Sequence, residues 1–321
     1  MASYRFGLSV AAVAFLVAMI ICVNVTPQSV PLFSNLTITN ETPAGVDPWC
    51  HQWSDPSIRI VISCLGDSIT YGNGSHDSKP IESIRRHRGN FPLTMREVIV
   101  AGLRSHAIDL RCPFVLSPTH IIVHNFGAPG ATLTPSNKWY HEDEAYRKAL
   151  TVVNASLAVV MLGTNDSKQW QNATYFIEHY RKLISSLRRA NKLLPVIILA
   201  PPPCFPDPNV FRKSGKCTVI SGISCESVSD SIRNASLTTS AVTDGVTYVD
   251  TFHGIMILYP QLAALKEQLR IKCNQTARSN VSVNVATLPL MFSDGVHPTA
   301  KVTHDIGSIA ATAVLKLLLV S

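Results

Sequence analysis

The chain has 321 residues, of which 46% are hydrophobic and 15% are charged. This composition is typical of a folded protein with a buried core and argues against a disordered chain. The length fits one α/β domain of roughly 260 residues preceded by a short N-terminal extension. The net charge is +7, but the basic residues are scattered, and the one dense basic cluster, at residues 85–88, is typical of a solvated helix face. We therefore expect no nucleic-acid partner.

An uncharged apolar run at residues 6–23 has about the length needed to span a bilayer. Arg5 precedes this run, and the next charged residue is Glu41, a distribution that favours a cytoplasmic N-terminus. We expect residues 1–5 to be a short cytoplasmic tail and residues 6–25 to be a transmembrane signal anchor or a cleaved signal peptide. Both alternatives place the rest of the chain in the secretory pathway, as a single-pass type II membrane protein or as a secreted protein.

Sequences of the form Asn-x-Ser/Thr, which accept N-linked glycans in the secretory pathway, are frequent in the chain. They begin at Asn24, Asn35, Asn40, Asn73, Asn154, Asn165, Asn172, Asn234, Asn274 and Asn280. Their density predicts a glycosylated surface that faces the lumen or the exterior. Residues 26–56 are rich in Pro, Ser, Thr and Asn, and we expect them to form a stem that leads to a folded domain at residues 57–321.

The chain has eight cysteines. Cys22 lies in the apolar run, and Cys64 lies in a strand-like stretch, where we expect a buried free thiol. The others form an even set that is consistent with three disulfides in an oxidising compartment: Cys50, Cys112, Cys204, Cys217, Cys225 and Cys273. Their spacing does not fix the pairing, but we expect Cys50 to pair with Cys112 and the other four to pair among themselves. No C-x-x-C pair occurs, so we expect no zinc site.

Strand-like and helix-like stretches alternate through the domain. Short apolar runs rich in β-branched residues predict five strands, at residues 58–65, 120–125, 157–162, 195–200 and 246–250. Their near-continuous hydrophobicity indicates a parallel sheet that is covered on both faces. Helices are expected at residues 93–105, 141–152, 173–190, 226–240 and 299–319. This alternation predicts a doubly wound α/β fold, with residues 201–225 and 260–290 as long loops on it.

Small, polar or titratable residues follow three of the predicted strands. Residues 66–72 follow the first strand, residues 127–132 follow the second, and residues 163–166 follow the third. Residues 294–298 form a fourth such segment immediately before the last predicted helix. Because ligands bind at the carboxyl ends of strands in open parallel sheets, we expect these segments to build an active site.

Each segment supplies a residue suited to acyl transfer. A serine hydroxyl becomes a good nucleophile when a base takes its proton, so we expect Ser68 to be the nucleophile and His297 to be its base. Asp294 can bind the other ring nitrogen of His297 and stabilise its charged form. The oxyanion that forms needs hydrogen-bond donors, and we expect the backbone N–H groups of Ser68 and Gly130 and the side-chain amide of Asn165 to supply them.

The same segments resemble the four signature blocks of the SGNH hydrolase (GDSL-like esterase/lipase) superfamily. They read GDSITYG at 66–72, NFGAPGAT at 125–132, LGTND at 162–166 and DGVHP at 294–298, in the family's order. The resemblance implies a flavodoxin-like three-layer α/β/α sandwich with a five-stranded parallel sheet.

By this resemblance, Ser68, Gly130, Asn165 and His297 match the residues that name the family, and Asp294 matches its triad acid. LGTNDSKQW and the later ILAPPP are also similar to a sialate O-acetylesterase-like subgroup. Insertions around 106–118, 204–225 and 260–290 depart from compact members and bear on the substrate more than on the chemistry.

Other residues of these segments have simpler interpretations. Asp67 is expected to hold the nucleophile turn by accepting hydrogen bonds from backbone amides. The remaining histidines show no ligand-like spacing and are expected at the surface or in packing roles. Asn165 begins a formal glycosylation sequence, but its proposed catalytic amide would be buried, so we expect no glycan there.

The residues and the resemblance together predict a serine esterase that forms an acyl-Ser68 intermediate and uses no metal and no cofactor. O-acetyl groups on carbohydrate are the leading substrate class, because a secretory enzyme meets glycans. Two alternatives are a lipid or lysophospholipid esterase and a catalytically silent, membrane-anchored carbohydrate-binding protein on the same fold. We expect the N-terminal segment to contact the membrane, and the sequence leaves the oligomeric state open.

Overall fold

The structure is a computed structural model that describes residues 47–73, 90–114, 116–205, 225–274 and 296–320. The predicted cytoplasmic tail, the membrane segment and most of the stem lie outside the described residues, and so does Asp294.

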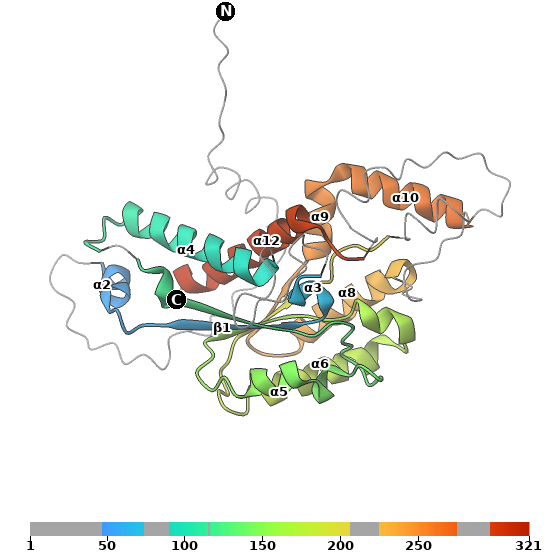
Figure 1. Ribbon diagram of the computed structural model, residues 1–321, viewed down its shortest axis with the longest axis horizontal. Coiled ribbons are helices and arrows are strands. Elements are labelled where there is room, and N and C mark those ends of the chain that lie inside the picture. Colours follow the sequence, from blue (N-terminus) through green and yellow to red (C-terminus); the bar gives the residue numbers. More distant parts are fainter. Residues whose placement is uncertain (1–46, 74–89, 115, 206–224, 275–295, 321) are drawn as a thin grey trace, which may run out of the picture.

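A five-stranded parallel sheet forms the centre of the domain (Figure 1). The strand order is β2-β1-β3-β4-β5, which is the order of flavodoxin-like folds. The strands are β1 (Ile60–Gly66), β2 (Ile121–Gly127), β3 (Leu157–Met161), β4 (Val196–Leu199) and β5 (Val246–Val249). Every residue of β1, β3 and β4 is buried, as the continuous apolar runs predicted. The prediction of five parallel strands is confirmed.

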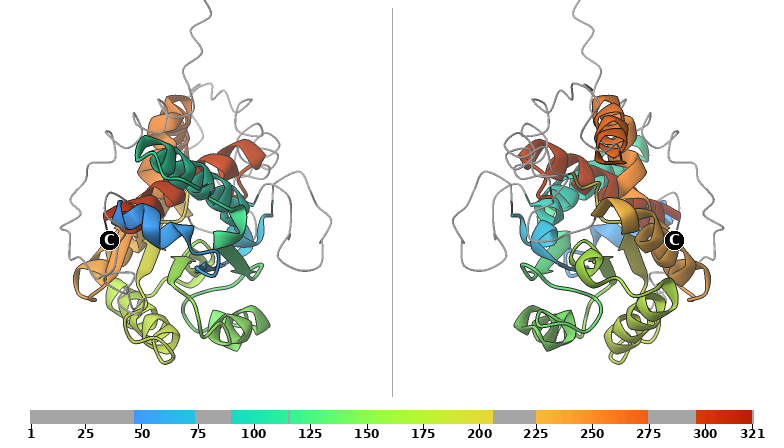
Figure 2. Two further views of the ribbon diagram at one scale, coloured as in Figure 1. Left: turned by 90° about the vertical axis from the view of Figure 1, so that its left-hand side faces the viewer. Right: turned by 90° about the vertical axis from the view of Figure 1, so that its right-hand side faces the viewer.

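Helices cover both faces of the sheet and complete three layers (Figures 1 and 2). One layer contains α4 (Phe91–Asp109), α9 (Thr251–Leu258), α10 (Pro260–Asn274) and α12 (Ala300–Val320). The opposite layer contains α5 (Glu144–Leu150), α6 (Ala173–Leu187) and α8 (Cys225–Ala241). Two apolar clusters fill the spaces between these layers and the sheet. The shorter helices are α2 (Pro48–Ser54), α3 (Ser68–Tyr71), η1 (Pro118–His120), η2 (Tyr140–Glu142) and η3 (Asn165–Gln169).

Two stretches predicted as irregular are helical. Residues 260–274 form α10, and Leu262 and Leu265, one helical turn apart, are buried against the core. The expected stem contains α2, which Asp47 caps by accepting the backbone N–H of Trp49 at 2.8 Å. Trp53 of α2 is fully buried in the core, so this part of the expected stem packs against the folded domain.

Cysteine pairing agrees with the prediction where the structure describes it. Cys50 of α2 forms a disulfide with Cys112, which follows α4, and this bond ties the start of the domain to one helical layer. Cys64 in β1 is a buried free thiol. Cys204 is also disulfide-bonded.

Helix α12 is long and apolar enough to cross a membrane, and it is the one such helix in the described part of the chain. Half of the most apolar stretch of this helix is buried inside the domain. Val302, Ile306 and Ile309 pack in the same apolar cluster as Met95 and Ile99 of α4. Its apolar character therefore has a structural cause in the core.

Two glycines allow α4 and α12 to approach closely. A Cβ added at Gly307 would lie 2.7 Å from Thr94 Cβ and 2.8 Å from the backbone oxygen of Phe91. A Cβ added at Gly102 would lie 2.6 Å from Leu315 Cδ1, which is the end of a flexible side chain.

We predict that Gly307→Ala destabilises the protein by about 1–3 kcal/mol, because the new methyl group meets a backbone atom that cannot turn away. Helix propensity alone would give the opposite sign, a gain of about 1 kcal/mol. Gly102→Ala is the matched control, since Leu315 can change rotamer, and we expect a much smaller loss there. Urea unfolding of both variants measures the difference, and equal stability of Gly307→Ala and wild type would contradict this account of the packing.

Candidate active site

Ser68 lies in a tight turn at the carboxyl end of β1. The side chain of Asp67 caps helix α3 by accepting the backbone N–H of Ile69 at 2.9 Å, and Ser68 is the first residue of that helix. Gly72 ends α3 in the left-handed conformation, with φ of 107°. The residues that begin and end the turn, Asp67 and Gly72, are therefore of types whose roles the sequence already indicates.

Two strand-end glycines let α3 sit directly on the edge of the sheet. A Cβ on Gly127 of β2 would lie 2.2 Å from the backbone nitrogen of Tyr71. A Cβ on Gly66 of β1 would lie 2.8 Å from Thr70 Cβ in α3. Only glycine permits this approach, which places the Ser68 hydroxyl at the point where β1, β2 and β3 end.

His297 reaches Ser68 from the other end of the chain. Its Nε2 atom lies 2.9 Å from Ser68 Oγ, although 229 residues separate the two. The predicted pairing of these side chains is thus present in the structure. Nε2 can accept the hydroxyl proton when the ring carries its proton on Nδ1.

Gly130 lies in a turn that follows β2. Ala131 N–H donates to the Ala128 carbonyl at 3.0 Å, and Gly130 has φ of 81°. Pro129 and Gly130 thus occupy the positions that a type II turn prefers for these two residue types. Ala128 N–H also donates to the Gly66 carbonyl at 2.9 Å, so this turn is fixed to the strand that carries Ser68.

Asn165 is the first residue of η3, after β3, and only 6% of it is exposed. Its Nδ2 donates to the Ala131 carbonyl at 3.1 Å. Because an amide nitrogen carries two hydrogens, the second can be donated to a substrate oxygen. The structure therefore brings together four of the five predicted site residues: Ser68, Gly130, Asn165 and His297.

A family model for the GDSL-like lipase/acylhydrolase family matches residues 64–302, most of the chain and every segment just described. The chain belongs to this family. It is accordingly an ester-hydrolysing enzyme on the SGNH fold, as the four signature segments predicted. No curated protein gives a significant match to this family member.

Solved structures of esterases resemble this acylhydrolase at low sequence identity. Est24, a carbohydrate acetylesterase from Sinorhizobium meliloti, is 15% identical, with 81% of this chain and 100% of that chain covered and a TM-score of 0.49. An aryl esterase from M. smegmatis is 17% identical, with 80% and 99% covered and a TM-score of 0.49. Similarities at this level bear on neither the substrate nor the mechanism of the GDSL-like enzyme described here.

Asp166 of η3 binds the loop that follows Gly130 in this acylhydrolase. It is buried directly after Asn165, and its Oδ2 accepts the backbone N–H of Leu133 at 2.9 Å. Its Oδ1 accepts the backbone N–H and the hydroxyl of Thr134, at 2.8 and 2.7 Å. Burial raises the pKa of Asp166, and the hydrogen bonds from Leu133 and Thr134 oppose that rise. The sequence analysis gave Asp166 no role, and its position beside Asn165 was the one available signal.

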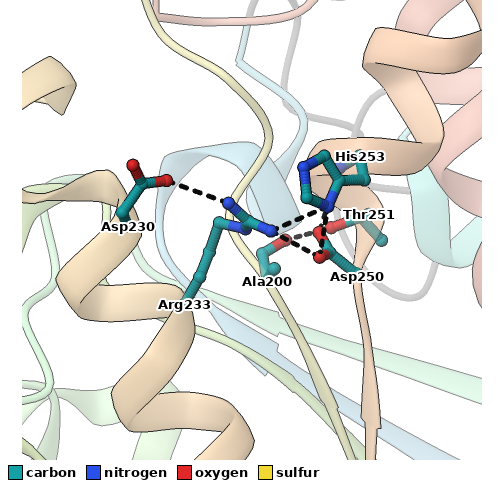
Figure 3. Close-up of polar contacts among 6 residues, drawn as sticks. All are labelled: Ala200, Asp230, Arg233, Asp250, Thr251 and His253. Carbon is teal, nitrogen blue, oxygen red and sulfur yellow. Dashed lines mark hydrogen bonds and ion pairs between the residues drawn. The ribbon is translucent and has the colours of Figure 1, made fainter. Parts of the chain in front are cut away.

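A second Asp-x-x-His pair lies at the carboxyl end of β5 (Figure 3). Asp250 caps α9, and its Oδ2 lies 2.9 Å from His253 Nδ1 and 2.6 Å from the Arg233 guanidinium of α8. Burial raises the pKa of Asp250, but the hydrogen bond and charge of Arg233 outweigh it and lower the pKa overall. The carboxylate is thus neutralised by Arg233, which also pairs with Asp230 at 2.9 Å. This cluster joins α8 to α9, and the expected packing role of His253 fits it.

Asp67 is fully buried and holds the nucleophile turn, as its expected structural role requires. Burial raises the pKa of Asp67 from 3.8 to about 6, although the hydrogen bond from Ile69 opposes the shift. The folded protein therefore binds this proton more tightly than the unfolded chain does.

We predict that Asp67 makes stability fall as the pH rises. Because its folded pKa of about 6 exceeds the ordinary 3.8, its contribution is complete below pH 4 and is lost as the pH passes 6. Relative to Asp67→Asn, which keeps the capping oxygen, the wild type should lose up to about 3 kcal/mol of unfolding free energy across this window. Urea unfolding from pH 4 to 8 measures the difference, and parallel curves for the two proteins would contradict the raised pKa.

Proposed function

We propose that this family member is a serine esterase that works through an acyl-Ser68 intermediate. The observation that carries the proposal is the 2.9 Å contact between His297 Nε2 and Ser68 Oγ at the carboxyl edge of the sheet. His297 takes the Ser68 proton while Oγ attacks the ester carbonyl carbon. Asp294, which lies outside the described residues, orients the imidazole and stabilises its charged form.

The attack moves negative charge onto the carbonyl oxygen. The backbone N–H groups of Ser68 and Gly130 and the second amide hydrogen of Asn165 stabilise that charge. When the tetrahedral intermediate collapses, the alcohol leaves with the proton from His297. Water then gives a proton to His297, attacks the acyl group and releases the carboxylic acid and the free Ser68 hydroxyl.

We predict that Ser68→Ala lowers the turnover of 4-nitrophenyl acetate by at least about 10³-fold, because no other group forms the acyl-enzyme. The variant should also fail to react with a fluorophosphonate probe. Ser54→Ala, which alters an exposed serine of α2 before β1, is the matched control and should keep full turnover and labelling. Undiminished turnover or labelling in Ser68→Ala would refute the mechanism. A wild-type protein with neither turnover nor labelling would support the silent binding protein instead.

The substrate that we propose is an O-acetyl ester on carbohydrate. The predicted secretory location would place the enzyme among glycans, and the string LGTNDSKQW is similar to sialate O-acetylesterase-like sequences. A series of 4-nitrophenyl esters from acetate to decanoate, run beside acetylated glycans and acyl lipids, tests this proposal. A preference for acetyl supports it, whereas a preference for long chains would support the lipid esterase.

We also propose that residues 6–25 anchor the enzyme or direct its secretion, so that the catalytic domain lies in the lumen or outside the cell. The Cys50–Cys112 disulfide is consistent with an oxidising compartment. The many Asn-x-Ser/Thr sequences fit the same location.

Asn172 and Asn165 provide a matched pair for testing this location. Asn172 is exposed and caps α6 through its Oδ1, at 2.9 Å from Tyr175 N, so a glycan on its Nδ2 leaves the cap intact. Asn165 is buried, and its Nδ2 already donates to Ala131. In protein secreted from eukaryotic cells, we predict a glycan on Asn172 and none on Asn165, as read by peptide mapping. A glycan on Asn165 would remove it from the mechanism, and unmodified sequences throughout would count against the location.

A further inference from the structure

The structure assigns to Lys138 the recognition of an anionic group on the substrate. We propose that this side chain makes the enzyme prefer esters that carry a carboxylate near the reacting carbonyl. The inference rests on the proposed function, because it places Lys138 beside the oxyanion donors of that mechanism.

Lys138 forms one wall of the space in front of Gly130. A Cβ built on Gly130 would lie 3.9 Å from Lys138 Cγ, and among the described residues no other atom outside Gly130 and its chain neighbours lies within 4 Å. The ammonium group lies three bonds beyond Cγ, within reach of a group attached close to the ester. It has no lone pair when charged, so it cannot act as a base, and the effect that we propose for it is on binding.

The backbone around Lys138 is fixed, so its side chain starts from a defined point. Its carbonyl accepts the N–H of Thr132 at 3.0 Å, and its N–H donates to Ser136 Oγ at 2.9 Å. Thr132 also forms an isolated bridge with Trp139. Asp166 binds the next two residues of the same loop, Leu133 and Thr134. The loop that carries Lys138 is therefore held by the same carboxylate that follows Asn165.

The charge of Lys138 is available to a ligand. Lys138 is exposed, and no residue in the described ranges forms an ion pair or a hydrogen bond with its ammonium group. By contrast, Lys148 is paired with Glu144 at 2.7 Å, and Arg233 with Asp230 and Asp250. The net charge of +7 adds a long-range attraction for anions.

The test compares two acetate esters of similar size, 4-acetoxybenzoate and its neutral analogue 4-acetoxybenzamide. The measured quantity is the ratio of their kcat/KM values in the full-length enzyme. Lys138→Gln should lower this ratio by about three- to tenfold, mainly through KM, and Lys138→Arg should restore most of it. Added salt at 0.5 M should erode the wild-type preference, because exposed charges are screened.

Lys316→Gln is the matched control, because it removes an equal charge from an exposed site about 24 Å along α12 from the residues that follow His297. It should leave the ratio unchanged. A second pair, 4-nitrophenyl hemisuccinate and 4-nitrophenyl butyrate, places the carboxylate on the acyl group instead of the leaving group. The pair whose kcat/KM ratio falls in Lys138→Gln shows on which side of the ester Lys138 binds the carboxylate. Equal ratios in wild type and Lys138→Gln for both pairs would overturn the assignment and leave the esterase intact. Absence of turnover for all four esters would instead refute the proposed function.

Discussion

The contact between Ser68 and His297 depends on how helix α12 packs against the rest of the domain. His297 directly precedes α12, and Val302 and Ile306 of that helix are buried in the core that it shares with α4. Close approach at Gly307 sets the position of α12 relative to α4. A hydrogen-bonding distance of 2.9 Å between side chains 229 residues apart is thus a consequence of apolar packing some turns away. A substitution that loosens the packing of α12 against α4 is therefore expected to change the distance between Ser68 and His297 as well.

Two buried carboxylates give the polar side of the site its rigidity. Asp67 and Asp166 are both removed from water, which disfavours their charged forms and raises the pKa of each. Backbone amides compensate for part of that cost, at Ile69 for Asp67 and at Leu133 and Thr134 for Asp166. Donors that are fixed before the substrate arrives need no reorganisation when charge develops on the carbonyl oxygen. In the mechanism that we propose, Asp67 and Asp166 therefore fix the Ser68 turn and the loop after Gly130 before the substrate binds.

Much of this arrangement could be predicted from the sequence, because its signals are local. The continuous apolar runs defined the five strands, and strand-end segments identified Ser68, Gly130 and Asn165. Other features depend on contacts that a single sequence does not display. Helix α2 is too short for a periodic pattern and depends on burial of Trp53 and on a disulfide to Cys112. The hydrogen bonds of Asp166 reach Thr134 and Leu133, which lie 32 and 33 positions earlier in the chain, so no local sequence pattern indicates them.

The loop to which we assign substrate recognition is bound by Asp166, which directly follows Asn165 in the chain. Ser68 follows β1 and His297 lies shortly before α12, whereas residues 131–139 form a separate loop whose Lys138 lies beside Gly130. That loop carries Lys138, and its residues Leu133 and Thr134 donate hydrogen bonds to Asp166, the neighbour of Asn165. Because Asp166 binds the loop through two backbone N–H groups and the buried Thr134 hydroxyl, the exposed side chains of the loop can change without disturbing these bonds.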